Sequence, residues 1–373
     1  MPVQIKQVKS KGDLRKFIYL PDKLHKNHAT WVPPLYSDEW KFLNPKENKA
    51  LSYSDTILFL AFRDNKVVGR IMGIINKNHN KLNNLKNGRF FLLESVNDQE
   101  VVHDLISSVE KWVRNKGMEK LVGPLGFSDK DPQGFLIEGF AHRAIIASLC
   151  NHKYMIDLIT GEGFTKEVDL LDFVIAVPEK IPEVYDRIFQ RASRKEGFVI
   201  LEFTKRKELR SFIIPVLRLM NECYSHIYGF VPIEENEMIK LADQYIPILD
   251  PKYVKAVTLD GEIAGFAIGI PDFSEGLQKS RGRLFPFGIF KIMKAMKNTD
   301  RVNLLLGAVK PKHQNKGINV MIAVKFFETA IAEGIKELES HLILETNTKM
   351  LGEVGKVGGK FHKRFRIYKK DLQ

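Results

Sequence analysis

The sequence repeats itself at a separation of about 196 residues, and this repeat constrains the fold more than any other feature. Residues 57–75 (ILFLAFRDNKVVGRIMGII) resemble residues 253–271 (YVKAVTLDGEIAGFAIGIP), and each reads as two strands joined by a tight turn. Two shorter matches keep the same order: 13–18 with 208–213, and Asn151-x-Lys153 with Asn347-x-Lys349. Several matches in one order predict two copies of one fold.

A fourth match shows where the copies differ. Residues 109–121 align with 326–338 at a separation of 217, so the second copy carries an insertion at about 272–300. Each copy mixes hairpin strands with crossover helices, which predicts an α+β (mixed α/β) layered fold. We expect a first domain at 1–177, a linking helix at 178–197 and a second domain at 198–373.

Residues 303–334 form a strand, a turn and a helix, in that order. The apolar run 304–309 ends at Pro311, a polar turn follows, and a helical apolar stripe then continues to Gly334. Such a turn gathers backbone N–H groups at a helix N-terminus, where phosphates bind. Three lysines add positive charge: Lys310, Lys312 and Lys316.

The pattern Val309-x-Pro311-x-x-Gln314-x-x-Gly317-x-Asn319 resembles the acyl-CoA loop of the GNAT family, the GCN5-related N-acyltransferases. It departs from the family at Asn319, where a small residue is usual. The resemblance implies two tandem GNAT-like domains, each with a mixed, mostly antiparallel sheet. It also implies that acetyl-CoA or another acyl-CoA binds the second copy. The expected contacts are Ala308, Val309, Lys310, Gln314, Asn315, Lys316, Gly317, Ile318, Asn319 and Asn347.

The first copy lacks the features of this loop. Glu100 stands where the second copy has Gly317, and the surrounding residues 94–100 are acidic. Carboxylates there would repel a pyrophosphate. We therefore expect the first copy to bind no CoA, to pack on the second, and to wall part of the acceptor site.

Candidate catalytic residues are few. Many GNAT enzymes carry an acid on the fourth strand, and this strand has none, so Glu345 at the end of the fifth strand is the candidate base. The usual tyrosine acid is replaced by Val354, which leaves Tyr368 as a candidate. We expect the oxyanion to be held by backbone near Val309, with Gly307 marking a bulge.

The acceptor is expected to be an amine of a small molecule or a peptide, lined by Tyr224 and Tyr228. No metal is expected, because Cys150 and Cys223 lack ligand spacing. The N-terminus has no signal-like apolar region, and no run approaches the length of a membrane span, so a cytoplasmic protein without a membrane partner is expected.

The formal charge of +13 leaves other readings open. A tandem GNAT-like transferase that uses aminoacyl-tRNA would suit a basic chain, although nucleic acid is the less favoured partner. An inactive CoA-binding regulatory protein would explain the missing acid and base. The sequence does not predict the oligomeric state.

Overall fold

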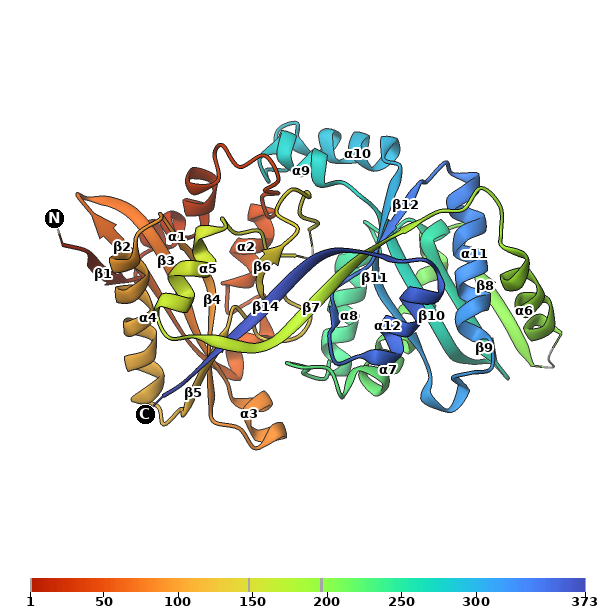
Figure 1. Cartoon of the computed structure of the whole chain (residues 1–373), viewed down its shortest axis with the longest axis horizontal. Coiled ribbons are helices and arrows are strands. Elements are labelled where there is room, and N and C mark those ends of the chain that lie inside the picture. Colours follow the sequence, from red (N-terminus) through yellow and green to blue (C-terminus); the bar gives the residue numbers. More distant parts are fainter. Residues whose placement is uncertain (1, 147, 195–196, 373) are drawn as a thin grey trace.

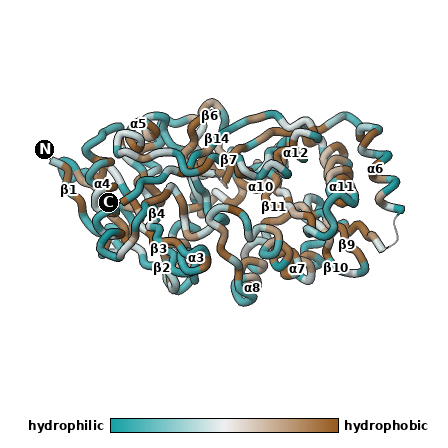
Figure 2. Tube along the Cα trace, turned by 60° about the horizontal axis from the view of Figure 1, so that its bottom comes forward, coloured by the Kyte–Doolittle hydropathy of each residue, from teal (hydrophilic) through white to brown (hydrophobic). Residues whose placement is uncertain are grey.

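The computed structural model describes residues 2–146, 148–194 and 197–372. Two similar halves lie side by side and share one long mixed sheet with helices on its faces (Figure 1). The expected layered mixed α/β architecture is confirmed. Apolar stretches follow the inner strands and helix α11 (Figure 2).

The first half and the connecting helix contain the following elements: β1 (Gln4–Gln7), α1 (Lys11–Leu24), α2 (Tyr36–Phe42), η1 (Lys49–Ser52), β2 (Ser54–Arg63), β3 (Lys66–Asn76), α3 (Lys77–Asn83), β4 (Asn87–Ser95), α4 (Gln99–Arg114), β5 (Lys120–Gly123), β6 (Phe135–Glu138), α5 (Tyr154–Gly161), β7 (Thr165–Ala176) and α6 (Glu183–Ser193).

The second half contains β8 (Phe198–Glu202), α7 (Arg206–Tyr224), α8 (Glu235–Tyr245), η2 (Pro251–Tyr253), β9 (Val254–Leu259), β10 (Glu262–Pro271), α9 (Ser274–Ser280), α10 (Gly288–Asn298), β11 (Arg301–Val309), η3 (Pro311–His313), α11 (Ile318–Ala332), β12 (Glu337–Glu339), β13 (Ile343–Leu344), α12 (Thr348–Lys356) and β14 (Lys360–Asp371).

The two hairpins read from the sequence are present. The β2–β3 turn uses Asp64 and Asn65 at φ +51° and +60°, and the β9–β10 turn uses Asp260 and Gly261 at φ +52° and +81°. Aspartate, asparagine and glycine tolerate these left-handed angles, and the resulting turn twist matches that of the strands. The insertion at 272–300 folds into α9 and α10, which sequence analysis had left unassigned.

The strand order is β1-β2-β3-β4-β5-β14-β7-β12-β11-β10-β9-β8. β14, the last strand of the chain, therefore lies between β5 and β7, and β7 pairs with β12 of the second half. Each half contributes its final strand to the other, and the two strands cross the middle of the molecule together (Figure 1). The boundaries at 177 and 198 stay predictions, because they were read from the sequence repeat. In the structure, strand pairing joins both repeats in one sheet.

A buried charge network lies where the exchanged strands meet. The Lys363 ammonium of β14 contacts Asp172 of β7 at 2.9 Å and also contacts Glu339 of β12. All three side chains are almost fully buried. Arg301 of β11 holds the second oxygen of Glu339 at 2.7 Å. Four strands are thus tied by one network, whose disruption would leave buried charge unpaired.

Burial, opposed by the nearby Lys363 charge, raises the pKa of Asp172 to about 8. Glu339 behaves in the opposite way: Lys363 and Arg301 overcome the effect of its burial and lower its pKa. This raised pKa predicts that Asp172 is protonated at neutral pH and that its carboxyl shares a proton with Glu339. One buried ammonium then faces one buried negative charge in this trio.

The variant Asp172→Asn tests this assignment. The folded protein binds a proton at Asp172 between about pH 4 and pH 8 and the unfolded chain does not, so wild-type stability falls as pH rises through this range. We expect the free energy of unfolding, measured in urea, to fall for wild type relative to the variant between pH 4 and pH 8. Asp243→Asn, at an exposed aspartate, is the matched control. A difference that does not change with pH would show that Asp172 is ionised.

Candidate functional site

The open edge of β11 is the first component of the candidate site. β11 pairs in parallel with β12 only at Arg301–Glu337, Val302–Leu338 and Asn303–Glu339. β11 then continues to Val309, whereas β12 ends at Glu339 and the chain after it pairs with β7 alone, through β13. The strands part after Asn303, and the edge from Leu304 to Val309 borders the gap between them.

A bulge lies at the start of this open edge. Ile268 of β10 is opposite Leu306, and the next residue, Gly269, is opposite Leu304, so Leu305 is the extra residue. Gly307 was expected to mark the bulge, but it pairs regularly with Ala267. The bulged Leu305 packs with Ile270 in the cluster beneath α9 and α10, which accounts for the position.

Tyr224 reaches the open edge from the end of α7. Its hydroxyl donates to the Gly307 carbonyl at 3.0 Å and accepts from the Gly307 N–H at 3.2 Å. Burial raises the pKa of Tyr224 to about 12, so the phenol stays neutral. The structure therefore places Tyr224 against the strand edge that borders the gap, where it satisfies backbone groups that a ligand could otherwise use.

The loop 310–317 joins β11 to α11. Gly317 adopts φ +91° and begins α11 with no side-chain cap. The first-turn amides of α11 are thus available to an anion, which the helix dipole also favours. Lys316 lies 3.3 Å from the His313 ring. Lys310 lies 3.4 Å from Glu262, so the charge of this lysine is balanced within the protein.

Glycine is required at 317 for two reasons. Its left-handed angle disfavours other residues, and a Cβ there would lie 2.9 Å from the Ala192 Cβ of α6. The connecting helix α6 therefore packs close to the start of α11. Nearby, Asn319 donates to Glu353 and ties α11 to α12. The unusual asparagine at 319 thus has a structural partner.

The corresponding position in the first half holds an internal anion. The Asp98 carboxylate caps α4 by accepting from the amides of Glu100 and Val101, and Arg63 pairs with both acids. The strand gap between β4 and β5 is also occupied, because Leu125 donates to Phe90 at 3.0 Å. In the first half the helix start is capped and the strand edge is occupied. In the second half the corresponding helix start is uncapped and the strand edge is open.

The Glu345 side chain contacts two residues of β7. One oxygen accepts from the Asp169 amide at 3.0 Å, and the other contacts Lys166 at 2.7 Å. Asn347 caps α12 through the Met350 amide at 3.1 Å. These contacts give both residues structural roles beside the functional roles expected of them.

Tyr368 and Tyr228 lie away from the loop 310–317. Tyr368 is 2% exposed and packs in the core of the first half, since β14 pairs there with β5. Tyr228 packs at the seam between the halves and donates to Glu167 at 3.3 Å. The structure thus does not bring either tyrosine together with the loop, and only the strand exchange explains where Tyr368 lies.

His341 is the residue that sequence analysis missed. It follows β12 by two residues, at the point where β11 and β12 part, and its side chain is half-buried. Burial lowers the pKa of His341 below its usual value of 6.5, opposed by the Asp129 charge, so the imidazole is neutral at pH 7. Asp129 belongs to the loop between β5 and β6 of the first half. The first half was expected to wall part of the acceptor site. A histidine directly after a short strand gives no sequence signal of its own.

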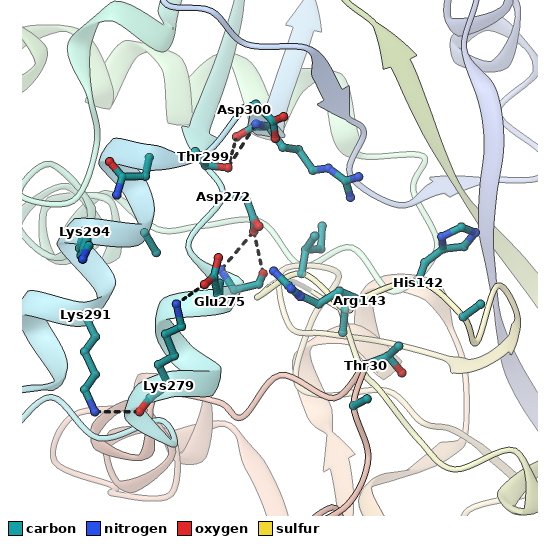
Figure 3. Close-up of a pocket in the computed structure, with 18 residues that line it drawn as sticks. Thr30, His142, Arg143, Asp272, Glu275, Lys279, Lys291, Lys294, Thr299 and Asp300 are labelled. Atoms are coloured by element: carbon teal, nitrogen blue, oxygen red, sulfur yellow. Dashed lines mark hydrogen bonds and ion pairs between the residues drawn. The ribbon is translucent and has the colours of Figure 1, made fainter.

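A cleft of about 840 Å³ lies between the α9–α10 insertion and the first-half loop 141–145. Asp272 lies near its centre, with Arg143 reaching toward it from the opposite side (Figure 3). Asp272 accepts from the Asn303 side chain at 3.1 Å. Asn303 is the last β11 residue paired with β12, so the cleft adjoins the point where the strands part.

Among the residues that the structure describes, two groups of side chains have the composition of a metal site. His25 and His28 share a nitrogen–nitrogen contact of 2.9 Å, and both rings stack on His152. That contact is a hydrogen-bond distance, shorter than the roughly 3.3 Å between two nitrogens on a tetrahedral zinc. In the second group, Asp172, Glu339 and His362, the Lys363 ammonium already supplies the cation. We propose no metal site at either group.

Comparisons with known proteins agree with this geometry. A tandem GNAT protein from the clavulanic acid biosynthesis pathway matches with a TM-score of 0.56 at 10% identity, over 100% of this chain and 99% of that one. A GCN5-related N-acetyltransferase from Sphaerobacter thermophilus matches with a TM-score of 0.52 at 11% identity, over 100% and 96%. The chain has the tandem fold of the GNAT superfamily. No protein-family model matches the sequence.

Two curated proteins match nearly the whole chain. A protein named bacterial ceramide synthase from Caulobacter vibrioides is 27% identical over 372 residues, which cover 98% of this chain and 96% of that protein. Protein YghO from Escherichia coli is 26% identical over 381 residues, covering 97% and 94%. Within the described residues, no helix has both the length and the apolar character needed to cross a bilayer.

Gly317→Glu tests the loop, because it places in the second half the acid that the first half has. We expect CoA binding, measured by isothermal titration calorimetry, to weaken at least about 100-fold through charge repulsion and steric conflict. Gly334→Glu is the matched control: it lies just beyond the other end of α11, at φ +71°, with no atom near a Cβ. Equal affinity for the Gly317 variant and wild type would mean that the loop does not bind CoA.

Proposed function

We propose that the protein is an acyl-CoA-dependent N-acyltransferase with its active site in the second half. The observation that carries the proposal is that the loop 310–317 joins the open edge of β11 directly to the uncapped start of α11. Helix amides and lysines suit a pyrophosphate, and an unpaired strand edge suits the amide groups of a pantetheine arm. The first half has neither feature. Acyl-CoA supply would place the reaction in the cytoplasm.

The acceptor we propose is a long-chain amine, and the donor a fatty acyl-CoA in preference to acetyl-CoA. Support comes from the relative named bacterial ceramide synthase, which matches 98% of this chain. A ceramide is the amide of a fatty acid with a long-chain amino alcohol. This proposal replaces the small or peptide amine expected from the sequence and keeps the predicted amide chemistry.

In the proposed reaction the amine nitrogen attacks the thioester carbonyl carbon, the C–S bond breaks, and an amide and free CoA form. Backbone N–H groups beside the Leu305 bulge would stabilise the oxyanion. His341 would take the proton that the attacking amine loses, because its imidazole is neutral at pH 7 and lies where the strands part. The thiolate leaves and takes up one proton, and His341 gives its proton back through water, so the reaction neither gains nor loses a proton.

The direct test combines binding with turnover. We expect calorimetry to show CoA binding, and mass spectrometry to show an amide when palmitoyl-CoA is incubated with sphinganine. Acetyl-CoA and ethanolamine serve as the short donor and the short acceptor. No binding at millimolar CoA would refute the acyl-CoA proposal, and binding without turnover on any amine would favour a regulatory CoA-binding protein.

His341→Ala tests the proposed base. We expect kcat to fall about 100-fold or more at pH 7 with unchanged CoA affinity, since a general base acts on the chemical step. In wild type, kcat/KM should rise with pH up to a pKa below 6.5 and then level off, and the variant should lose this acid limb. His103→Ala in the first half is the control. An unchanged pH profile in the His341 variant would remove it as the base.

A further inference from the structure

The segment 281–298 exposes the largest concentration of apolar side chains among the described residues. The exposed fractions are 81% for Phe285, 68% for Phe287, 65% for Phe290, 60% for Met293 and 41% for Ile289. In α10, Ile289, Phe290 and Met293 lie on one side of the helix by their spacing. These five residues, here called the apolar face, belong to α10 and the three residues before it. α9 and α10 lie at one edge of the molecule, outside the sheet (Figure 1).

The opposite side of α10 is well packed, so the exposure of the apolar face is not a consequence of loose folding. Ile292 is 9% exposed and packs with Leu277 and Phe273, and Ala295 and Met296 join the same cluster. The two helices cross closely: a Cβ on Gly276 would lie 2.6 Å from the Ile292 Cα. A rigid support therefore presents a second hydrophobic side to the solvent, which is unusual for a water-soluble surface.

The charged residues within the segment 281–298 all have one sign. Residues 281–298 include five basic residues and no acidic one: Arg281, Arg283, Lys291, Lys294 and Lys297. The three lysines recur every third residue along α10 and are exposed. Of the two arginines, Arg283 has an acidic partner, Asp22, at 3.0 Å. Lysines beside exposed phenylalanines on a short helix are the pattern of interfacial membrane helices.

We propose that α10 and the residues just before it dock on the surface of an anionic phospholipid bilayer. The phenylalanines, Ile289 and Met293 enter the boundary between headgroups and acyl chains, and the lysines contact the lipid phosphates. Charge complementarity favours a bilayer over a second copy of this chain, because the same basic face on a partner would repel it. The expectation of no membrane partner considered spanning segments, and surface docking needs none.

The docking surface borders the cleft at the site. Lys291 and Lys294 of α10 line that cleft together with Asp272. A bilayer held against α10 would therefore bring lipid headgroups to the entrance of the cleft. If the acceptor is a long-chain amine, it could reach the site from the membrane; this last step rests on the proposed function, whereas the docking itself does not.

Vesicle flotation tests the docking. With vesicles of 70% phosphatidylcholine and 30% phosphatidylglycerol in 0.1 M salt, we expect wild type to float with the lipid. The triple variant F285S/F287S/F290S should bind at least about tenfold more weakly, through lost apolar contact. K291E/K294E/K297E should lose on the order of 100-fold affinity for these vesicles. Added salt should weaken wild-type binding.

Matched controls separate specific docking from general effects of charge and hydrophobicity. Leu82→Ser removes another exposed apolar side chain, and K11E/K81E/K111E makes the same charge change on exposed first-half lysines. Both should bind vesicles like wild type. Calorimetry with CoA on the phenylalanine variant checks its fold, and its outcome is independent of flotation. Equal flotation of wild type and both α10 variants would overturn the proposal. A second result would also overturn it: wild type does not float but self-associates, and the phenylalanine variant no longer self-associates.

Discussion

The rest of the structure depends on the contact between Lys363 and the two buried acidic side chains of Asp172 and Glu339. These side chains come from β14, β7 and β12, the strands that the two halves exchange or share. A buried ammonium is tolerated only because a negative charge accompanies it. Glu339 supplies that charge, and its second oxygen accepts a hydrogen bond from Arg301. The same arrangement fixes where β12 stands beside β11, and therefore where the two strands separate. The open edge of β11 is a consequence of that separation.

The local parts of this fold could be read from the sequence, and the long-range pairing could not. Turn residues such as Asp260-Gly261 predict their hairpin, and Gly317 after a polar turn predicts the start of a helix. Both predictions depend only on residues that are neighbours in the sequence. The strand exchange has no local signal: β14 would show the same alternation beside β12 or beside β5. That ambiguity placed Tyr368 near the site in the sequence analysis, whereas the structure places it in the first-half core.

The candidate site divides in the same way. The start of α11 at an uncapped glycine after a polar turn follows from residue type and spacing, so it could be predicted. His341 could not, because its relevance comes only from the parting of β11 and β12. The bulge at Leu305 likewise depends on packing beneath α9 and α10, elements that sequence periodicity left as an insertion. The repeat itself provides an internal comparison: one fold holds an acid at the helix start in the first half and an uncapped glycine in the second.

The central claim is that acyl-CoA enters between β11 and β12 of the second half. A crystal structure with a non-reactive thioether analogue of palmitoyl-CoA tests it most directly. The account predicts the pyrophosphate against the first-turn amides of α11 and the pantetheine arm along Leu304–Val309, with the Tyr224 hydroxyl displaced from Gly307. An analogue bound between β4 and β5 of the first half, or one whose pyrophosphate lies away from Gly317, would contradict it.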